Sequence, residues 1–573
     1  MNATSLKPLW PLLLPAILAG AVFWQVGSFA FVNLDDDIYI TDNPLLQHGI
    51  SPADAFASDY AEVWIPATWL SFMTDRALQG PGPAGYHRTN LVLHIINVLL
   101  VGMLCLRLLN NRWAAAAAAG IFAVHPLGVE AVCWVTARKD LLSGTFALGA
   151  MVIHVAGNGR RNTARTVVVL LLALLAMLAK PAMVVLPAWL VLADAWRSTT
   201  TGQRLRTALT RAWGTKLAIL LAAAPVAVVT IRLAKGTEYG LRTQDGLWER
   251  MGQAGFMILA WLGRILWPRG LAPIYPPASW EQPAGVLLVS VVMVLALTMG
   301  ALLLARQRPL LTWGWLWFLV GVAPAVGIVR GGQLLMSDRY LYLPLLGIVV
   351  FAVCVLQKLA GRRPGLLKPL AAAALVVILA LAVAGHRQAG LWRDPLLLWE
   401  HTLDVTTDNA TAHTNYAVVL NANGRPDEAL AHLETSLRIA PHSLAHYNAG
   451  NILNAQGRLD EAVVHFRAAR RRNPERLEFC LNLGALLART GRTEEALEVL
   501  RDAIRRHPQS APANYNLGLV HWLRGSRSAA QEAWRRALVL DPGHVDARRM
   551  LERSRVIDPA TTSSPANGDS SDP

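Results

Sequence analysis

The sequence predicts an all-α protein in which a polytopic bundle of membrane helices is followed by a C-terminal helical solenoid. Two observations lead to this fold class. First, 54% of the 573 residues are hydrophobic, and before residue 390 they gather in apolar blocks of about 20 residues, the length of a helix that crosses a bilayer. Second, these blocks then stop, and amphipathic helical periodicity with a regular repeat replaces them.

This change of texture divides the chain into three parts. We predict a multi-span transmembrane domain over residues 1–390, a solenoid over 391–555 and a disordered tail over 556–573, where Ser, Pro and Asp dominate. Within the first part, segments 33–90 and 234–284 lie between apolar blocks. We expect them to form a large first external loop and a second external segment.

The apolar blocks predict about eleven membrane spans. One further apolar stretch, 251–267, contains Arg264 and is flanked by prolines, so we expect a re-entrant or interfacial helix there. The predicted spans cover residues 9–32, 91–109, 113–127, 141–156, 166–180, 182–196, 215–233, 285–305, 310–329, 340–357 and 369–386.

Lys and Arg predict the orientation of these spans. Basic residues gather in alternate loops, which the positive-inside rule assigns to the cytoplasm. We therefore expect a cytoplasmic N-terminus and an external solenoid. The Ala-, Leu- and Arg-rich composition fits a high-GC bacterium, so we expect a bacterial inner-membrane protein whose solenoid is periplasmic. The net charge of +15 then reflects topology and an Arg-rich C-terminal part, so we expect no nucleic-acid partner. The basic loops are 107–112, 160–165, 197–216, 306–308 and 358–368.

A repeat of about 34 residues runs through the C-terminal part, a period typical of tetratricopeptide repeats. Asn415, Asn448, Asn482 and Asn516 follow it, together with turn glycines and with prolines near the repeat ends. We expect four repeats that stack helix pairs into a solenoid. A half-repeat around Trp399 precedes them, and a capping helix follows over 545–555.

The recurring Asn side chains predict a peptide-binding groove on the concave side of the solenoid. An amide can pair with both the N–H and the C=O of an extended backbone without reading side chains. We predict that Asn415, Asn448, Asn482 and Asn516 hold such a segment. The alternative is that Asn is common at this repeat position and binds nothing.

An acidic triplet, Asp35-Asp36-Asp37, directly follows the first predicted span, where carboxylates are costly unless they are solvated, paired or used. Cations from other loops share the expected external side. A carboxylate can take a proton from a hydroxyl nucleophile, and Arg or Lys can stabilise a departing phosphate. The combination favours group transfer from a lipid phosphate. The cations are Arg138, Lys139, Lys180 and Arg339; the alternative is that they are interfacial anchors.

Several segments, in this order, resemble the transmembrane and tetratricopeptide repeat-containing family, and the resemblance covers about residues 20 to 550. That family is similar to the GT-C glycosyltransferases. The resemblance implies an inverting transfer of a hexose, such as mannose, from a polyprenyl-phosphate donor to Ser or Thr of periplasmic proteins. The segments are Phe31–Asp36, Trp64–Trp69, Tyr86–Asn97, His125–Glu130, Ala137–Asp140, Ala179–Pro181 and Asp338–Pro344.

The resemblance also implies roles for single residues. Asp35 or Asp36 acts at the acceptor hydroxyl, and the choice between them stays open. The four cations contact the donor phosphate. The other expected partners are extended segments of periplasmic or secreted proteins, bound by the solenoid, and membrane lipids. A divalent metal varies among GT-C enzymes, so its presence and ligands stay open. Supporting roles fall to Glu130, His87, Asp140 and Tyr342.

Two other functions fit parts of the sequence. A non-enzymatic membrane anchor could display the repeats as a scaffold for envelope assembly, and such a scaffold would tolerate Asn at Asp35 and Asp36. A lipid-linked saccharide ligase or transporter would need no peptide groove, and a transporter would place polar residues deep inside its spans.

Overall fold

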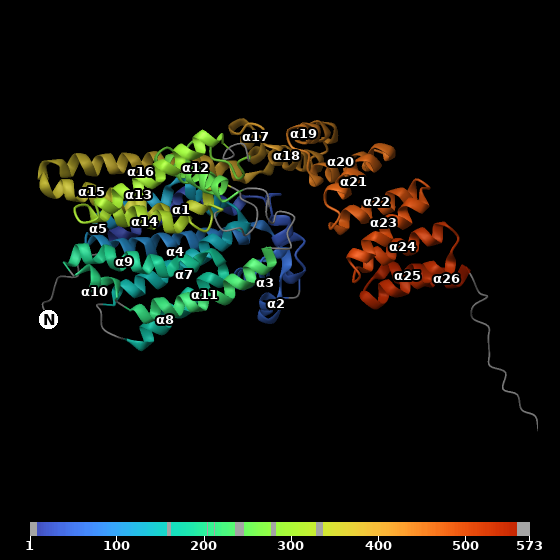
Figure 1. Cartoon of the computed structure of the whole chain (residues 1–573), viewed down its shortest axis with the longest axis horizontal. Helices are drawn as coiled ribbons and strands as arrows, with labels where there is room; N and C mark the ends of the chain where they lie inside the picture. Colours follow the sequence, from blue (N-terminus) through green and yellow to red (C-terminus); the bar gives the residue numbers. More distant parts are fainter. Residues whose placement is uncertain are drawn as a thin grey trace, which may run out of the picture. The chain divides into compact units, whose positions relative to one another are not determined.

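The computed structural model describes residues 9–557 apart from 48, 158–161, 203, 211, 235–245, 277–281 and 328–335. Every regular element among these residues is a helix (Figure 1), which confirms the predicted all-α class. The chain divides into two compact units, Met1–Asn415 and Tyr416–Pro573. Most of the predicted tail 556–573, parts of segment 234–284 and part of the basic loop 160–165 lie outside the described residues.

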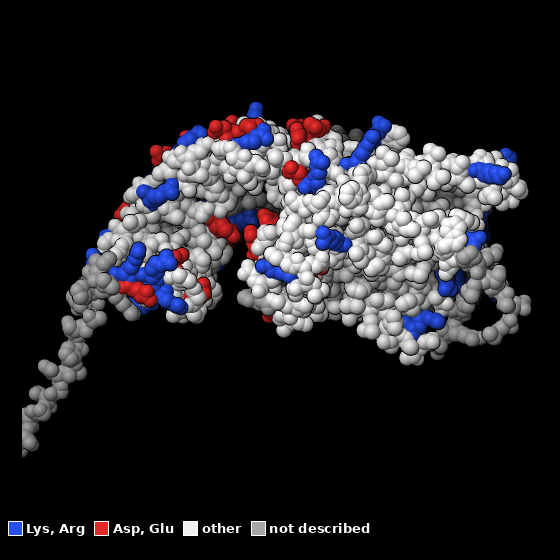
Figure 2. All heavy atoms as spheres, turned by 180° about the vertical axis from the view of Figure 1, so that it is seen from behind, with Lys and Arg blue, Asp and Glu red and all other residues white. Residues whose placement is uncertain are grey.

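The first unit is a bundle of apolar helices around one continuous hydrophobic core. Helix α4 packs against α5 and α7, and α7 packs against α8. Figure 2 shows few Lys, Arg, Asp or Glu side chains over the visible face of this unit. The helices are α1 (Leu13–Phe23), α4 (Pro83–Leu109), α5 (Arg112–Val124), α7 (Arg138–Ala156), α8 (Thr163–Ala179), α9 (Leu186–Thr201), α11 (Trp213–Ala234), α12 (Leu247–Leu266), α13 (Ala284–Leu303), α14 (Pro309–Val322), α15 (Leu345–Arg362) and α16 (Leu367–Gly390).

Among the described residues of this unit, six helices are long and apolar enough to cross a membrane, or seven if the bent pair Arg112–Val124 and Pro126–Cys133 is one span. The sequence predicted about eleven. Each predicted range does contain a helix, but α8 and α14 have only 17 and 14 residues, fewer than the roughly 20 of a full span. The six are Trp10–Ser28, Pro83–Leu109, Trp213–Leu233, Ala284–Leu303, Leu345–Arg362 and Pro364–Arg393.

The predicted external loop 33–90 folds into a small helical layer. It contains α2 (Pro52–Ala57) and α3 (Pro66–Gln79), each of which begins at a proline, a residue whose fixed φ suits the first helical position. Aromatic side chains, including Trp69 and Phe72, form its own core. Helix α3 packs against α4, α7 and α8, so the layer covers the ends of the membrane helices.

Four helix pairs and a terminal helix follow, as the repeat spacing predicted. The turns within the pairs use glycines such as Gly491, with φ of +78°, where other residues would be strained. A Cβ atom at Gly484 would lie 2.8 Å from Leu500 Cγ, so the paired helices leave no room there. The helices are α18 (Ala410–Ala422), α19 (Pro426–Ile439), α20 (Ser443–Ala455), α21 (Leu459–Arg472), α22 (Leu477–Arg489), α23 (Thr493–Arg506), α24 (Ala511–Leu523), α25 (Arg527–Leu540) and α26 (Val545–Ile557).

The sequence groups the helix around Trp399 with the solenoid, whereas the contacts group it with the membrane helices. Helix α17 (Pro395–Val405) belongs to the first unit, and α18 begins in that unit and ends in the second. The segment that joins α16 to the repeats is therefore packed as part of the first unit.

Candidate functional site

Asp35 and Asp36 are neighbours with different environments. Asp36 is fully buried, and its Oδ1 accepts hydrogen bonds from the Thr136 backbone N at 3.0 Å and hydroxyl at 2.7 Å. Its Oδ2 accepts one from the Val32 backbone N at 3.0 Å. Burial raises the pKa of Asp36 to about 7, although these hydrogen bonds lower it. Asp36 therefore ties the acidic loop to the segment that precedes α7.

Asp35 is half-buried, and its carboxylate makes no hydrogen bond or ion pair with any residue that the structure describes. Burial raises its pKa, while the charges of Lys139 and Arg339 lower it, so both cations lie within electrostatic range. Lys139 is also half-buried, without an ion pair among the described residues, and its Nζ lies 4.9 Å from the centroid of the Tyr39 ring. Asp35 and Lys139 are thus a half-buried acid and a half-buried cation that lack an ion-pair partner among the described residues.

Arg339 and Lys180 are each held by an acid. Arg339 Nη1 lies 2.5 Å from Glu130 Oε1, and the Arg339 backbone N donates to Glu130 Oε2 at 3.0 Å. Lys180 forms an ion pair with the buried Asp140. Both cations face the Tyr340 ring, whose centroid is 5.0 Å from Arg339 Cζ and 5.2 Å from Lys180 Nζ. The two ion pairs therefore meet at one aromatic side chain.

Arg138 has a different environment from Lys139 although the two are adjacent. It is fully buried, and Nε donates to Asn90 Oδ1 at 2.7 Å while Nη2 donates to the Tyr86 carbonyl at 2.7 Å. Nη1 donates to Ser71 Oγ at 3.0 Å and pairs with Asp75. Each nitrogen of this guanidinium has a protein acceptor, so Arg138 holds α3 and α4 to the start of α7.

The remaining predicted supporting residues lie inside the bundle. His87 is buried, with Nε2 at 3.2 Å from the Ala30 carbonyl oxygen. The buried Tyr342 hydroxyl lies 2.9 Å from His94 Nδ1 and accepts from Asn97 Nδ2 at 3.1 Å. Of the four predicted supporting residues, Glu130 and Asp140 are thus the two that form ion pairs with predicted cations among the described residues.

A further polar group around Asp338 joins segments that the sequence did not connect. The Tyr275 hydroxyl donates to Asp338 Oδ2 at 2.6 Å, and Arg264 Nη1 lies 3.5 Å from Asp338 Oδ1. Burial raises the pKa of Asp338 to about 7. Arg264 and Asp338 each stood out in the sequence, but no spacing pattern links residues so far apart. Among the described residues, no three His, Cys, Asp or Glu side chains form a group that could hold a metal ion.

All four predicted groove residues occupy equivalent positions, each being the sixth residue of the first helix of its repeat, with Asn415 on α18. Asn448, Asn482 and Asn516 lie on α20, α22 and α24 and are half-buried. Asn482 Nδ2 donates to the Tyr447 hydroxyl at 2.9 Å, whereas the amides of Asn448 and Asn516 have no hydrogen-bond partner among the described residues. Asn415 is the last residue of the first unit.

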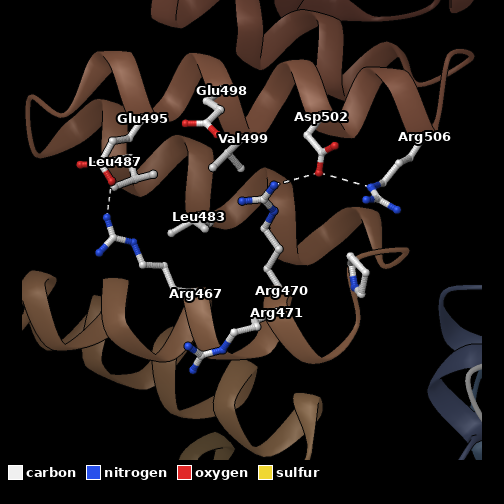
Figure 3. Close-up of a pocket in the computed structure, with 11 residues that line it drawn as sticks. Arg467, Arg470, Arg471, Leu483, Leu487, Glu495, Glu498, Val499, Asp502 and Arg506 are labelled. Carbon is white, nitrogen blue, oxygen red and sulfur yellow. Dashed lines mark hydrogen bonds and ion pairs between the residues drawn. The ribbon is translucent and has the colours of Figure 1, made fainter.

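The repeats also contain a cavity of about 400 Å³ that the sequence did not predict. It lies between α21, α22 and α23, with Leu483, Leu487 and Val499 among its apolar lining (Figure 3). Arg470 crosses it to donate to Asp502 Oδ2 at 2.8 Å. None of the Asn residues lines this cavity, so it is separate from the predicted groove.

Comparisons with known proteins find tetratricopeptide repeats in the C-terminal part and relatives that align with most of the chain. Tetratricopeptide repeat families match residues 408–475 and 453–518. The chain is 23% identical over 438 residues to a Caenorhabditis elegans protein O-mannosyl-transferase, covering 72% of this chain and 60% of that protein. It is 35% identical over 117 residues to the Drosophila melanogaster protein O-mannosyl-transferase Tmtc1, covering 20% and 14%. For the human protein O-mannosyl-transferase TMTC3, identity is 29% over 153 residues, covering 25% and 16%.

Solved structures of tetratricopeptide repeat proteins also resemble part of the chain. YrrB, described as a TPR protein with an unusual peptide-binding site, is 24% identical with a TM-score of 0.26, covering 28% of this chain and 82% of that one. A thermophilic TPR protein of Thermus thermophilus is 28% identical with a TM-score of 0.23, covering 26% and 82%. The chain spans less than two thirds of the three curated relatives. It is a homologue of proteins named protein O-mannosyl-transferases of the TMTC family, with candidate membrane spans and tetratricopeptide repeats.

Proposed function

We propose that the chain is an inverting membrane glycosyltransferase of GT-C type that moves a hexose, such as mannose, from a polyprenyl phosphate to Ser or Thr hydroxyls of periplasmic proteins. In this proposal it lies in a bacterial inner membrane, with the Asp35 side and the repeats in the periplasm. One observation carries the proposal: the unpaired carboxylate of Asp35 lies within electrostatic range of the unpaired Lys139 and of Arg339. The names of the homologues support the same reaction class.

The chemistry is a single displacement at the anomeric carbon of the sugar. Asp35 takes the proton from the acceptor hydroxyl, and the hydroxyl oxygen bonds to the anomeric carbon. The bond from that carbon to the phosphate oxygen breaks, and its electron pair leaves with the polyprenyl phosphate. One displacement inverts the configuration. Lys139 and Arg339 stabilise the charge that develops on the phosphate.

The environments of Asp35 and Asp36 suit different roles in this step. A general base works best with a pKa near the operating pH, and burial raises the pKa of Asp35. Its carboxylate is also free to meet a hydroxyl. Asp36 is fully buried and already bonded to Val32 and Thr136, so we assign it to positioning. Every guanidinium nitrogen of Arg138 already donates to a protein acceptor, so we also assign Arg138 to positioning. We assign Lys180 to the donor phosphate.

The repeats supply the acceptor in this proposal. The unpaired amides of Asn448 and Asn516 can pair with the backbone of an extended segment. A segment held by the same chain reaches the acid at a higher effective concentration than one that arrives from solution.

The test is a glycoproteome comparison by mass spectrometry in the source cells. The strains carry the wild-type gene, a deletion, Asp35→Asn or Asp37→Asn at matched protein levels. Asp37 is the exposed neighbour in the same triplet and serves as the matched control. We expect hexose to disappear from the same peptides in the deletion and Asp35→Asn strains only. Unchanged peptides in the deletion strain would reject the transferase and favour a scaffold.

A further inference from the structure

We infer that Asn33 is a positioning residue for Asp35, held in place by α17 and the first turns of α18. The inference rests on the proposed function, because it concerns the residue assigned there as the base. Asn33 lies two positions before Asp35, and all residues of this contact belong to the first unit.

The Asn33 amide bonds at both ends to the segment that leads into the repeats. Its Oδ1 accepts a hydrogen bond from the Trp399 indole Nε1 at 2.8 Å, and its Nδ2 donates to the Asn415 backbone oxygen at 3.0 Å. Trp399 lies on α17 and is fully buried. An amide with one donor and one acceptor bond is fixed in orientation as well as in place.

This segment is itself attached to the membrane unit by contacts independent of Asn33. The His401 ring Nε2 lies 3.2 Å from the Leu271 carbonyl oxygen, and Asn409 Nδ2 donates to the Ile274 carbonyl at 3.1 Å. The Ala30 backbone N donates to the Arg393 carbonyl at 3.3 Å. Trp399 and Asn415 therefore form a fixed support against which the acidic loop is held.

The same segment also supports the cationic side of the site. Trp392, three residues before the start of α17, stacks on Trp134 with ring centroids 6.4 Å apart and planes at 29°. Arg339 lies over the Trp134 ring, with Cζ 4.7 Å from its centroid. The stretch from Trp392 to Asn415 thus contacts the loop that carries the acid and the ring that carries one of the cations.

Asp35 depends on this support because its own carboxylate has no partner among the described residues. Its backbone carbonyl accepts a hydrogen bond from the Tyr39 backbone N at 2.9 Å. On either side of it, Asp36 is bonded to Thr136 and Asn33 is bonded to Trp399. Releasing Asn33 frees one of these three attachments. A displacement of about 1 Å at a catalytic group can lower the rate by up to about 100-fold.

The test uses the full chain in lipid nanodiscs with Asn33→Ala, Trp399→Phe and the double variant. Phe keeps the ring in the core and removes only the indole N–H. Asp404→Asn, exposed on the same α17 helix, is the matched control. Hydrogen–deuterium exchange of residues 29–42 gives a readout that needs no enzymatic activity. Sugar transfer to a peptide acceptor, with kcat and KM measured separately, gives the functional readout.

We expect faster exchange over 29–42 in Trp399→Phe, although the substitution lies far away in the sequence. We expect kcat to fall about 10-fold in both single variants, with the peptide KM unchanged. The kcat of the double variant should be no lower than that of Asn33→Ala, because both substitutions remove the same hydrogen bond between Asn33 and Trp399. Wild-type exchange over 29–42 in Trp399→Phe, or additive losses of kcat, would overturn the inference. If the wild-type chain itself transfers no sugar, the proposed function fails, and the exchange result still decides whether the contact holds the loop.

Discussion

Arg339 and Glu130, 209 positions apart in the sequence, meet through both the side chain and the backbone of the arginine. Arg339 Nη1 lies 2.5 Å from Oε1, and the Arg339 backbone N donates to Oε2 at 3.0 Å. Both carboxylate oxygens are therefore used. This carboxylate fixes the start of the segment before α15 as well as the position of the guanidinium.

Glu130→Gln should destabilise the first unit. The amide keeps one acceptor, but its NH₂ group would face either the Arg339 backbone N–H or its guanidinium. Removing one partner of a buried ion pair typically costs about 3–5 kcal/mol. We expect a clear drop in the Tm of the purified protein in detergent, with unfolding measured by tryptophan fluorescence. Glu400→Gln, exposed on α17, is the control and should melt like wild type; equal Tm values for the two variants would contradict this account.

Arg138 and Lys139 should respond in opposite ways to substitution. Arg138→Lys leaves several buried acceptors unpaired, which costs about 2 kcal/mol or more, so yield and Tm should fall. Lys139→Ala should keep the wild-type Tm, because Lys139 has no ion pair to lose among the described residues. Its sugar transfer should fall about 100-fold through the loss of a charge at the donor phosphate. A stable, fully active Lys139→Ala protein would remove Lys139 from the site.

Asp36 should make stability depend on pH in a defined direction. Its pKa is about 7 in the folded protein and near 3.8 when unperturbed, so the folded state binds more protons between these values. Stability then falls as pH rises from about 4 to about 7. Asp36→Asn lacks this slope. It also turns an NH₂ group toward the Val32 or Thr136 backbone N–H, so it should be less stable than wild type at pH 5.

The check is the difference in Tm between wild type and Asp36→Asn, measured in detergent at pH 5 and pH 8. The difference should shrink at the higher pH. Asp37→Asn, an exposed change in the same loop, controls for the loss of one negative charge. A difference in Tm that stays the same between pH 5 and pH 8 would show that Asp36 is ionised in the folded protein throughout this range.

Asn448→Ala with Asn516→Ala should weaken acceptor binding and leave the chemical step intact. Each amide can form two hydrogen bonds to a peptide backbone, and each bond is worth about 1 kcal/mol net. We expect the KM of an acceptor peptide to rise about 10-fold or more with kcat unchanged. Glu498→Ala, which alters the cavity between α21 and α23, should leave KM alone. A rise in KM in Glu498→Ala instead would move the acceptor site to that cavity.

Local sequence patterns predicted most of the fold but little of the candidate site. Turn glycines such as Gly491 recur at a fixed spacing, so the repeats could be predicted. Asp35 and Asp36 could not be told apart, because the partner that distinguishes them, Thr136, lies 100 positions away. Arg138 and Lys139 look alike in sequence, and only the packing of α3 and α4 against α7 buries one of them. The contact of Asn33 with Trp399 joins the two ends of the first unit, which no spacing rule reaches.

The most direct test of the central claim is sugar transfer by the purified chain in liposomes. The donor is a polyprenyl phosphate with radiolabelled mannose, the acceptor is a peptide found by the glycoproteome comparison, and label in the peptide is measured over time. We expect transfer by wild type and Asp37→Asn, and at least a 100-fold loss in Asp35→Asn at unchanged Tm. Equal transfer by Asp35→Asn and Asp37→Asn would contradict the assignment of Asp35 as the group that takes the acceptor proton.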